Sequence, residues 1–157
     1  MDKRLLNKKV IVTGGSRGIG AGIVERLYNE GAEIIIADIK EDLALELMKN
    51  LKTDKISFFK TDLRNEKEIV SLIEEANQKW GCLDILINNA GIEDGYLLSD
   101  QTYEAYKNTM KINLDAPFLS SKYALPLLEK SESGRIIMIS SIQGIRGYKG
   151  NNSYNTA

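Results

Sequence analysis

Val-Ile-Val-Thr-Gly-Gly-Ser-Arg-Gly-Ile-Gly, residues 10–20, is the stretch that decides the fold. Three β-branched residues lead into glycines at positions 14, 15, 18 and 20, and apolar residues then recur at helical spacing as far as Tyr28. This pattern predicts a strand, a tight turn and a helix. Because glycines let phosphates approach the backbone and a helix N-terminus attracts negative charge, such a turn is typical of a pyrophosphate site. The alternative is a turn that only needs flexible residues.

Apolar runs that are typical of buried strands recur along the chain. They lie at residues 10–12, 34–37, 56–59, 85–87 and 136–139. Most are continuous, whereas a half-exposed strand would alternate apolar and polar residues. Helical patterns lie between the runs. This alternation predicts one α/β domain over residues 1–157, with a doubly wound parallel sheet of about five strands.

The last helical pattern is unusually long and contains two prolines. It runs from about residue 103 to residue 128, and Pro117 and Pro126 lie inside it. Proline removes a backbone N–H and clashes with the preceding turn, so we expect a bend or a split of the helix at these positions.

Composition excludes several classes of function. The chain carries 21 basic and 22 acidic side chains, and no basic cluster is interleaved with aromatic residues, so neither nucleic acid nor a membrane is the expected partner. Histidine is absent, which excludes Ser-His-Asp and Cys-His catalysis. The single cysteine, Cys82, cannot form an internal disulfide, and no metal site is expected. We expect a cytoplasmic protein that acts on small molecules.

The spacing of the glycines narrows the choice of cofactor site. It departs from the general dinucleotide pattern G-x-G-x-x-G, and no Lys-Ser/Thr pair follows it, which argues against a P-loop ATPase or GTPase. Thr13-Gly14-x-x-x-Gly18-x-Gly20 resembles the glycine motif of the short-chain dehydrogenase/reductase family. The resemblance implies a Rossmann-like sheet with strand order 3-2-1-4-5 and hydride transfer between a nicotinamide cofactor and an alcohol or ketone. It assigns to the cofactor site Thr13, Gly14, Ser16, Arg17, Gly18, Ile19 and Gly20.

Asp38 follows the second apolar run, 18 residues after Gly20. In dinucleotide-binding folds, a carboxylate about 20 residues after the glycines contacts the adenosine ribose. Its oxygens accept hydrogen bonds from two ribose hydroxyls and repel a 2′-phosphate, so Asp38 favours NAD over NADP. Two alternatives stay open. Asp38 could end its strand for turn reasons alone, or Arg17 or Lys40 could pair with a 2′-phosphate.

Two further segments follow the third and fourth apolar runs. They are Thr61-Asp62-Leu63 and Asn88-Asn89-Ala90-Gly91. Both fall at the carboxyl ends of predicted strands, where ligands bind in open α/β sheets. The family resemblance implies that Asp62 and Leu63 lie at the adenine. It also implies that Asn89, Ala90 and Gly91 border the cofactor and support the central sheet. Taken alone, the second segment is equally well explained as a strand-ending turn.

Ser141 and Tyr154 lie after the last apolar run, 13 residues apart, and Asn113 lies in the long helical pattern. Their order and spacing resemble the catalytic residues of the family. Hydride transfer requires proton exchange at the substrate oxygen and hydrogen-bond donors for its developing charge. The resemblance gives proton exchange to Tyr154, polarisation of the oxygen to Ser141 and a water-mediated proton relay to Asn113. A phenol titrates at about pH 10 and needs a nearby positive charge to act at neutral pH, which the family supplies as the lysine of Tyr-x-x-x-Lys.

The chain ends at Ala157, one residue before the position of that lysine. We therefore expect an incomplete sheet whose fifth strand is an exposed edge, an inactive isolated chain, and a homo-oligomer in the complete form. Three hypotheses stay open. The chain is the cofactor-binding portion of an NAD-dependent dehydrogenase, a catalytically silent nucleotide-binding or interaction protein, or a chain shortened by cloning or proteolysis.

The substrate is not identified by the sequence. Five residues expected near the substrate are polar, namely Glu93, Asp94, Tyr96, Gln143 and Tyr148. They suggest a hydroxylated substrate, although surface loops are commonly polar for other reasons. Sugars, polyols, steroids and 3-oxoacyl thioesters all remain open.

Overall fold

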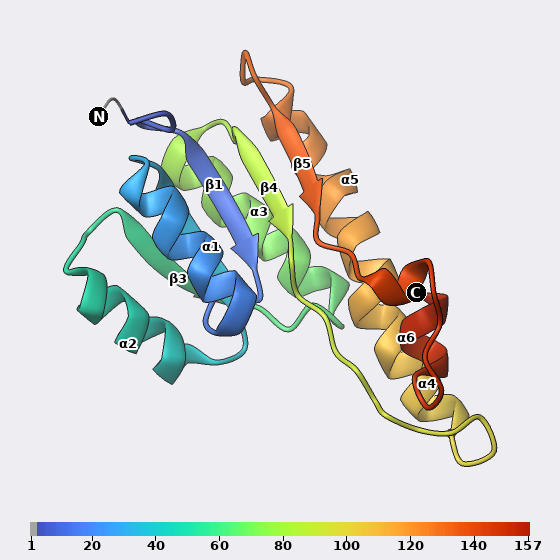
Figure 1. Cartoon of the computed structure of the whole chain (residues 1–157). Coiled ribbons are helices and arrows are strands. Elements are labelled where there is room, and N and C mark those ends of the chain that lie inside the picture. Colours follow the sequence, from blue (N-terminus) through green and yellow to red (C-terminus); the bar gives the residue numbers. More distant parts are fainter. Residues whose placement is uncertain (1–2) are drawn as a thin grey trace.

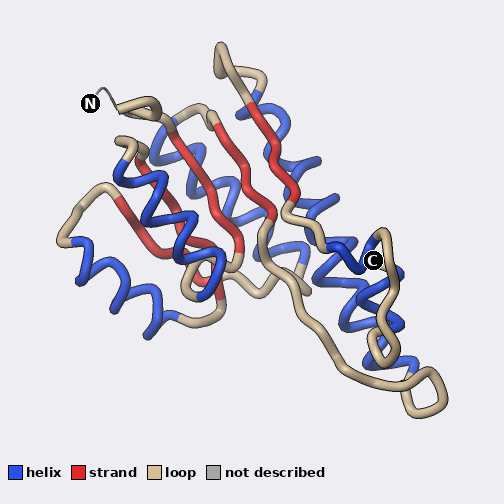
Figure 2. Tube along the Cα trace, viewed as in Figure 1, coloured by secondary structure: helices blue, strands red, loops and turns tan. Residues whose placement is uncertain are grey.

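A computed structural model of the chain describes residues 3–157 and contains a parallel five-stranded sheet (Figures 1 and 2). The strands are β1 (Lys9–Thr13), β2 (Glu33–Asp38), β3 (Ile56–Lys60), β4 (Ile85–Asn88) and β5 (Arg135–Met138). Their order is β3-β2-β1-β4-β5, which confirms the predicted order. Each strand begins and ends within one residue of its predicted range. The doubly wound α/β fold is therefore confirmed.

Helices cover both faces of this sheet (Figure 1). The α-helices are α1 (Gly18–Asn29), α2 (Glu41–Leu51), α3 (Glu66–Trp80), α4 (Tyr103–Met110), α5 (Ala116–Leu128) and α6 (Asn152–Thr156). A π-helical segment, η1 (Lys111–Asp115), joins α4 to α5, and a 3₁₀ turn, η2 (Ile142–Gly144), follows β5. Helices α1 and α2 pack on one face of the sheet, and α3 and α5 pack on the other.

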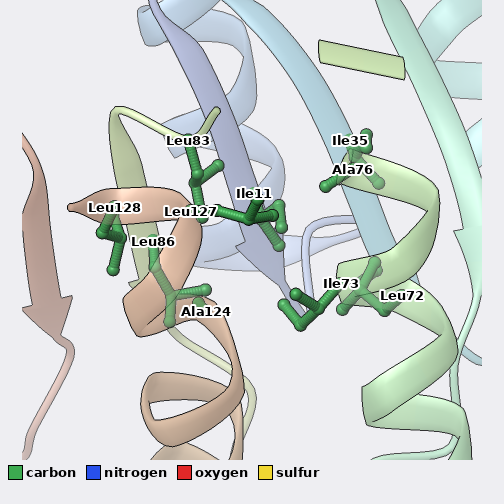
Figure 3. Close-up of a cluster of buried hydrophobic side chains, with 11 residues drawn as sticks. Ile11, Ile35, Leu72, Ile73, Ala76, Leu83, Leu86, Ala124, Leu127 and Leu128 are labelled. Carbon is green, nitrogen blue, oxygen red and sulfur yellow. The ribbon is translucent and has the colours of Figure 1, made fainter. Parts of the chain in front are cut away.

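Alternation along β1 divides the core into two layers. Ile11 points into the layer formed with α3 and α5, which Figure 3 shows. Val10 and Val12 point into the layer formed with α1 and α2. All three side chains are fully buried. Because side chains alternate between the faces of a strand, a continuous apolar run fills both layers at once.

The long helical pattern is interrupted before its first proline. Pro117 lies in the first turn of α5, and its missing N–H would otherwise donate to the carbonyl of Asn113 inside η1. The hydrogen-bond pattern widens there from α to π, so the expected split is found. Pro126, in contrast, lies inside α5, which continues to Leu128. The expected split is therefore not found at this proline.

The edge strand β5 differs from the inner strands. It pairs only with β4, and Ile136, Ile137, Met138 and Ile139 are 39%, 42%, 52% and 41% exposed. An open groove of about 450 Å³ lies beside it, lined by residues of α5 and β5 that include Leu125, Leu128 and Ile136. The expected exposed apolar edge is confirmed.

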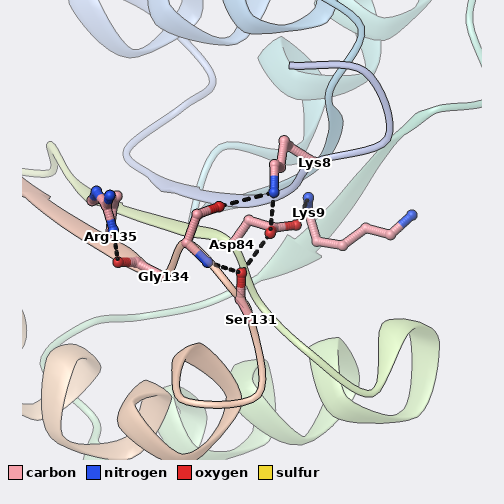
Figure 4. Close-up of polar contacts among 7 residues, drawn as sticks. Lys8, Lys9, Asp84, Ser131, Gly134 and Arg135 are labelled. Atoms are coloured by element: carbon pink, nitrogen blue, oxygen red, sulfur yellow. Dashed lines mark hydrogen bonds and ion pairs between the residues drawn. The ribbon is translucent and has the colours of Figure 1, made fainter. Parts of the chain in front are cut away.

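At the amino ends of the strands, the Asp84 carboxylate joins three segments (Figure 4). Its oxygens accept from Lys8 Nζ at 2.9 Å, from the Lys9 N–H at 2.8 Å and from Ser131 Oγ at 2.6 Å. The Arg135 N–H donates to the Asp84 carbonyl at 2.8 Å. Burial acts to raise the pKa of Asp84, but hydrogen bonds from Ser131, Lys9 and Lys8 hold that pKa below its ordinary value. The start of β1 is thereby fixed to β4 and β5.

Candidate functional site

The predicted cofactor residues gather at the carboxyl edge of the sheet, where β1, β2, β3 and β4 end. The Gly14 N–H donates to the Ala37 carbonyl at 2.8 Å, and the Thr61 N–H donates to the Asp38 carbonyl at 3.0 Å. These bonds continue the sheet past the strand ends and hold the loops after β1 and β3 on either side of the end of β2. Parallel topology thus brings together segments that are distant in sequence.

Two glycines of the turn are required by close packing. A Cβ on Gly20 would lie 2.0 Å from the Gly14 carbonyl oxygen. A Cβ on Gly14, which has φ +64°, would lie 2.8 Å from Ala90 Cα. Gly18 differs, since its φ is +55° and no heavy atom lies within 4 Å of a Cβ built there. The turn is therefore closed against β4 on one side and open at Gly18.

Around Gly18, several polar groups lack protein partners. Helix α1 begins there after Arg17, whose side chain makes no capping hydrogen bond. Within residues 3–157, the N–H groups of Gly18, Ile19 and Gly20 have no hydrogen-bond acceptor. Ser16 is 5% exposed, and its buried Oγ has no partner in that same part of the chain. Free N–H groups at a helix start suit an anion such as a pyrophosphate.

Asp38 closes the other side of this turn. Its carboxylate accepts from the Ser16 N–H at 3.1 Å and from the Lys40 N–H at 3.1 Å. Among residues 3–157, neither the Arg17 nor the Lys40 side chain forms an ion pair with Asp38. The residue is partly exposed, so its carboxylate can accept further hydrogen bonds.

Thr13 and Asn89 hold the turn against β4. Thr13 Oγ1 accepts from the N–H groups of Asn89 at 3.0 Å and Ala90 at 3.2 Å, and it donates to the Ile87 carbonyl at 3.3 Å. Asn89 Nδ2 donates to the carbonyls of Thr13 and Gly14, both at 3.0 Å. The side-chain hydrogen bonds of Thr13 and Asn89 thus go to the backbone of the loop. Ala90 and Gly91 supply the backbone that faces Gly14 and Asn113.

Asp62 lies at the end of β3, next to the residue that bonds to Asp38. Its carboxylate is paired with Arg64, whose Nη2 lies 2.6 Å from Oδ2. The Arg64 side chain lowers the pKa of Asp62 below its ordinary value. The Asp62 N–H donates to Glu68 at 2.7 Å, and the neighbouring Leu63 is half-buried. The carboxylate is thus held by its own loop, and no hydrogen bond joins it to the glycine turn among the described residues.

Asn113 lies in η1, where its side chain binds both main-chain groups of one residue, Ile92, in the loop after β4. Oδ1 accepts from the Ile92 N–H at 2.9 Å, and Nδ2 donates to the Ile92 carbonyl at 2.9 Å. The π-helical turn that precedes Pro117 carries this side chain. Asn113 therefore fixes the loop that leads away from the glycine turn.

Ser141 and Tyr154 lie on neighbouring short elements. Ser141 caps η2, and its Oγ accepts from the Gln143 N–H at 3.2 Å, which leaves the hydroxyl proton free to donate. Tyr154 lies in α6, which packs against η2, and its hydroxyl has no hydrogen-bond partner within residues 3–157. The start of this helix at Asn152, two residues before Tyr154, was not predicted.

A polar cluster that includes Ser153, the residue before Tyr154, was also missed. Asp94 Oδ2 accepts from Gln101 Nε2 at 2.6 Å, from Thr109 Oγ1 at 3.3 Å and from Ser153 Oγ. Ser153 and Thr109 are fully buried. The sequence marked Asp94 only as a polar loop residue, because nothing in the pattern joins it to a serine 59 positions away.

Two further properties concern the chain as described, residues 3–157. No helix in this part combines the length and apolar character that crossing a membrane requires. Nor does this part hold a group of three or more His, Cys, Asp or Glu side chains arranged to bind a metal ion.

Comparison with known proteins agrees with this geometry. A family model described as short chain dehydrogenase matches residues 8–157. Momilactone A synthase of Oryza sativa subsp. japonica is 29% identical over 157 residues, which cover 99% of this chain and 57% of that protein. Tropinone reductase-like 2 of Erythroxylum coca is 36% identical over 144 residues, 89% of this chain and 52% of that protein.

Among solved structures, the crystal structure of gox2181 has a TM-score of 0.91 and 28% identity, over 99% of this chain and 62% of that chain. The present chain thus spans between 52% and 62% of the length of these three relatives. The family model extends from the start of β1 to the last residue. The observed strand order, β3-β2-β1-β4-β5, is the order expected for this family. The chain belongs to the short-chain dehydrogenase family.

Proposed function

We propose that this chain supplies the dinucleotide site and three catalytic residues of an oxidoreductase that transfers hydride between NAD(H) and an alcohol or ketone. The observation that carries the proposal is the turn open at Gly18, where the free N–H groups of α1 and the unpartnered Ser16 hydroxyl face the same edge of the sheet as Asp38. Family membership supports a nicotinamide cofactor, NAD or NADP.

The residues present suit the diphosphate of such a cofactor. Ser16 Oγ is a buried polar atom without a partner, and a ligand oxygen would satisfy it. The N–H groups of Gly18, Ile19 and Gly20 would donate to phosphate oxygens, while the exposed Arg17 offers charge at the rim. Ile19 is 70% exposed, which leaves an apolar side chain free to cover a bound nucleotide.

Asp38 supports NAD rather than NADP. A carboxylate accepts hydrogen bonds from ribose hydroxyls and repels a 2′-phosphate. Neither Arg17 nor Lys40 neutralises it among the described residues, so the negative charge stands unopposed at the rim of the turn. Asp62, Leu63, Ala90 and Gly91 would form further walls of this site, with Thr13 and Asn89 behind them.

The catalytic roles follow from the hydrogen bonds that each residue leaves unused. When bound, the nicotinamide supplies or accepts the hydride. Ser141 has a free hydroxyl proton to donate to the substrate oxygen, and the Tyr154 hydroxyl is free to exchange a proton with it. Asn113 uses its amide on Ile92, so in this proposal it holds the loop and supports the relay through its backbone and ordered water.

Fluorescence titration of the 157-residue chain with NADH and with NADPH tests the cofactor site. We expect NADH to bind weakly and NADPH at least tenfold more weakly. Tighter binding of NADPH would overturn the interpretation of Asp38, and no binding of either nucleotide would overturn the site. NADH binding without any turnover, even after extension of the chain through the lysine position, would instead support the silent nucleotide-binding protein.

The catalytic roles need the extended chain. Joined to the carboxyl-terminal segment of a relative such as gox2181, Tyr154→Phe should abolish turnover and leave the affinity for NADH unchanged. Tyr103→Phe, at an exposed tyrosine of α4, is the matched control. Turnover retained in Tyr154→Phe would remove Tyr154 from the mechanism.

The exposed edge supports self-association of the isolated chain. Four consecutive apolar residues of β5 and its end are between 39% and 52% exposed, and an unpaired parallel edge of this kind binds other strands. Light scattering of the purified chain should therefore show oligomers. A monodisperse monomer would contradict this part of the proposal.

A further inference from the structure

Helix α6 is a single turn in which Asn152, Ser153 and Asn155 are held by other parts of the chain, Thr156 bonds within the helix, and Tyr154 is the exception. Asn152 Nδ2 donates to the Tyr96 carbonyl at 3.1 Å, and Asn155 both accepts from the Tyr148 N–H and donates to the Tyr148 carbonyl. Ser153 donates to Asp94. Tyr154 is the exception, with a hydroxyl that no hydrogen bond within residues 3–157 uses. A helix this short is not stable by itself, so these anchors set its orientation.

The Asp94 side chain is the charged anchor of α6. Its Oδ2 binds Ser153 from α6, Gln101 from the loop and Thr109 from α4, so one oxygen joins three segments. Its Oδ1 is buried and has no partner in the described part of the chain. Burial acts to raise the pKa of Asp94, but the bonds from Ser153, Gln101 and Thr109 outweigh it and lower that pKa below the ordinary value. The carboxylate is therefore charged at neutral pH.

Successive residues of a helix point about 100° apart. Because Ser153 is fully buried against Asp94, the next side chain, Tyr154, is turned out of that interface and is half-buried beside η2. The direction of the phenol is thus tied to the bond made by its neighbour. Ser153 and Thr109 have no alternative acceptor of comparable charge among their hydrogen bonds.

The same loop also reaches Asn113. The Asn113 side chain holds the N–H and the carbonyl of Ile92 in this loop, and Asp94 follows two residues later. A short segment, residues 92–94, therefore connects Asn113 to the helix that carries Tyr154. In Figure 1 the segment after β4 runs away from the sheet toward α4 and α6, so it has no strand partner to hold it.

We propose that Asp94 is a positioning residue, which fixes the orientation of Tyr154 through Ser153 and couples it to Asn113 through residues 92–94. The inference rests on the proposed function, since it gives Tyr154 a chemical role that requires a fixed direction. Displacement of a reacting group by about 1 Å can cost on the order of 100-fold in rate.

The experiment uses ¹³C-labelled tyrosine rings in the 157-residue chain, which has 7 tyrosines. Comparison with Tyr154→Phe identifies the Tyr154 signal. In Asp94→Ala, that signal should move toward the position of a tyrosine in an unfolded chain, while the signals of Tyr28 in α1 and Tyr123 in α5 stay unchanged. Asp100→Ala, an exposed aspartate of the same loop whose carboxylate binds only Ser99, is the matched control and should leave Tyr154 unmoved.

Ser153→Ala removes the hydroxyl that donates to Asp94 and keeps the Asp94 carboxylate. This variant tests the proposal if Asp94→Ala does not fold. It should move the Tyr154 signal in the same direction but less far than Asp94→Ala, because Asp94 also holds Gln101 and Thr109. The shift in the double variant should be smaller than the sum of the two single shifts, since both substitutions remove the Ser153–Asp94 bond. A Tyr154 signal that is unmoved in Ser153→Ala would overturn the proposal. The proposal would also be overturned if all tyrosine signals of Asp94→Ala moved together toward their unfolded positions, since Asp94 would then support the whole fold. NADH titration of the unsubstituted chain tests the proposed function separately.

Discussion

The two ends of the same sheet use their polar residues in opposite ways. At the amino end, each oxygen of the Asp84 carboxylate is occupied, by Lys8 and Ser131 on one side and by the Lys9 N–H on the other (Figure 4). At the carboxyl end, the Ser16 hydroxyl and the first N–H groups of α1 have no partner within residues 3–157. One end satisfies its hydrogen-bonding groups internally, and the other leaves several of them without a partner among the described residues.

The difference separates stability from binding within one fold. A buried carboxylate that binds three donors lowers the free energy of the folded chain, and removal of it leaves those donors unpaired. Unpaired groups at the opposite end cost stability until a ligand satisfies them. Substitutions at the two ends should therefore have effects of different kinds, which the following predictions examine.

Asp84→Ala should give the largest effect, at the amino end. It removes the acceptor of the Lys9 N–H and the Ser131 hydroxyl and leaves the Lys8 ammonium only Ser133 Oγ, so we expect it to lower the free energy of unfolding by roughly 3 kcal/mol. Urea unfolding followed by circular dichroism measures this loss. NADH affinity of the fraction that remains folded should not change. A large loss of NADH affinity with an unchanged free energy of unfolding would contradict the assignment of stability to the amino end and binding to the carboxyl end.

Gly20→Ala and Gly18→Ala form a matched pair at the carboxyl end. The Gly20 methyl would lie 2.0 Å from the Gly14 carbonyl oxygen, so the turn must shift, at a cost of about 2 kcal/mol in unfolding free energy. The Gly18 methyl meets no atom, and its positive φ costs only about 1 kcal/mol. That methyl would instead enter the proposed ligand volume, and NADH affinity should fall about tenfold, or about 1.4 kcal/mol.

Thermal unfolding and NADH titration of both variants distinguish these effects. Equal losses of stability in the two variants would show that the turn is not closed at Gly20. Unchanged NADH affinity in Gly18→Ala would move the diphosphate away from this opening.

The sheet was predictable because its information is local. Continuous apolar runs such as residues 34–37 indicate strands buried on both faces, and the glycine turn after β1 indicates a parallel strand followed by a helix. The strand order came from the family resemblance, since apolar patterning alone does not say which strands are neighbours. The end of the long helical pattern at Leu128 was also predicted correctly, although Pro126 lies inside the helix.

The sequence predicted that the candidate residues lie at the carboxyl edge of the sheet, but it did not predict their hydrogen-bond partners. Thr13 and Asn89 were expected at the cofactor, whereas their side chains bind each other's backbone across β1 and β4. The bond from Ser153 to Asp94 joins residues 59 positions apart. Such partners depend on how loops cross in space, and neither the type of residue nor its spacing encodes that.

Thr13→Val should have a smaller effect than the substitutions above. It keeps the shape of the side chain but removes the acceptor for the Asn89 and Ala90 N–H groups and the donor to Ile87. Because Asn89 Nδ2 still ties the two strands, we expect a loss of about 1 kcal/mol in unfolding free energy. Hydrogen exchange should show the loss at the N–H groups of residues 89 and 90. Unchanged exchange there would mean that Thr13 does not close the turn.

The smallest effect should come from Glu30, at the end of α1 on the amino side of the sheet. Hydrogen bonds from Arg4 and then Arg26 lower its pKa from 4.5 to about 2. A lowered carboxyl pKa stabilises the fold above about pH 4.5, and this contribution is lost as the pH falls toward 2. The thermal midpoint of Glu30→Gln should thus lie below that of the unsubstituted chain at pH 7, and the two midpoints should converge near pH 2. Glu25→Gln, an exposed position on the same helix, should shift neither. A difference that grows on acidification would have the wrong sign for a carboxylate held by these arginines, and it would leave Asp84 as the principal charged anchor of the amino end.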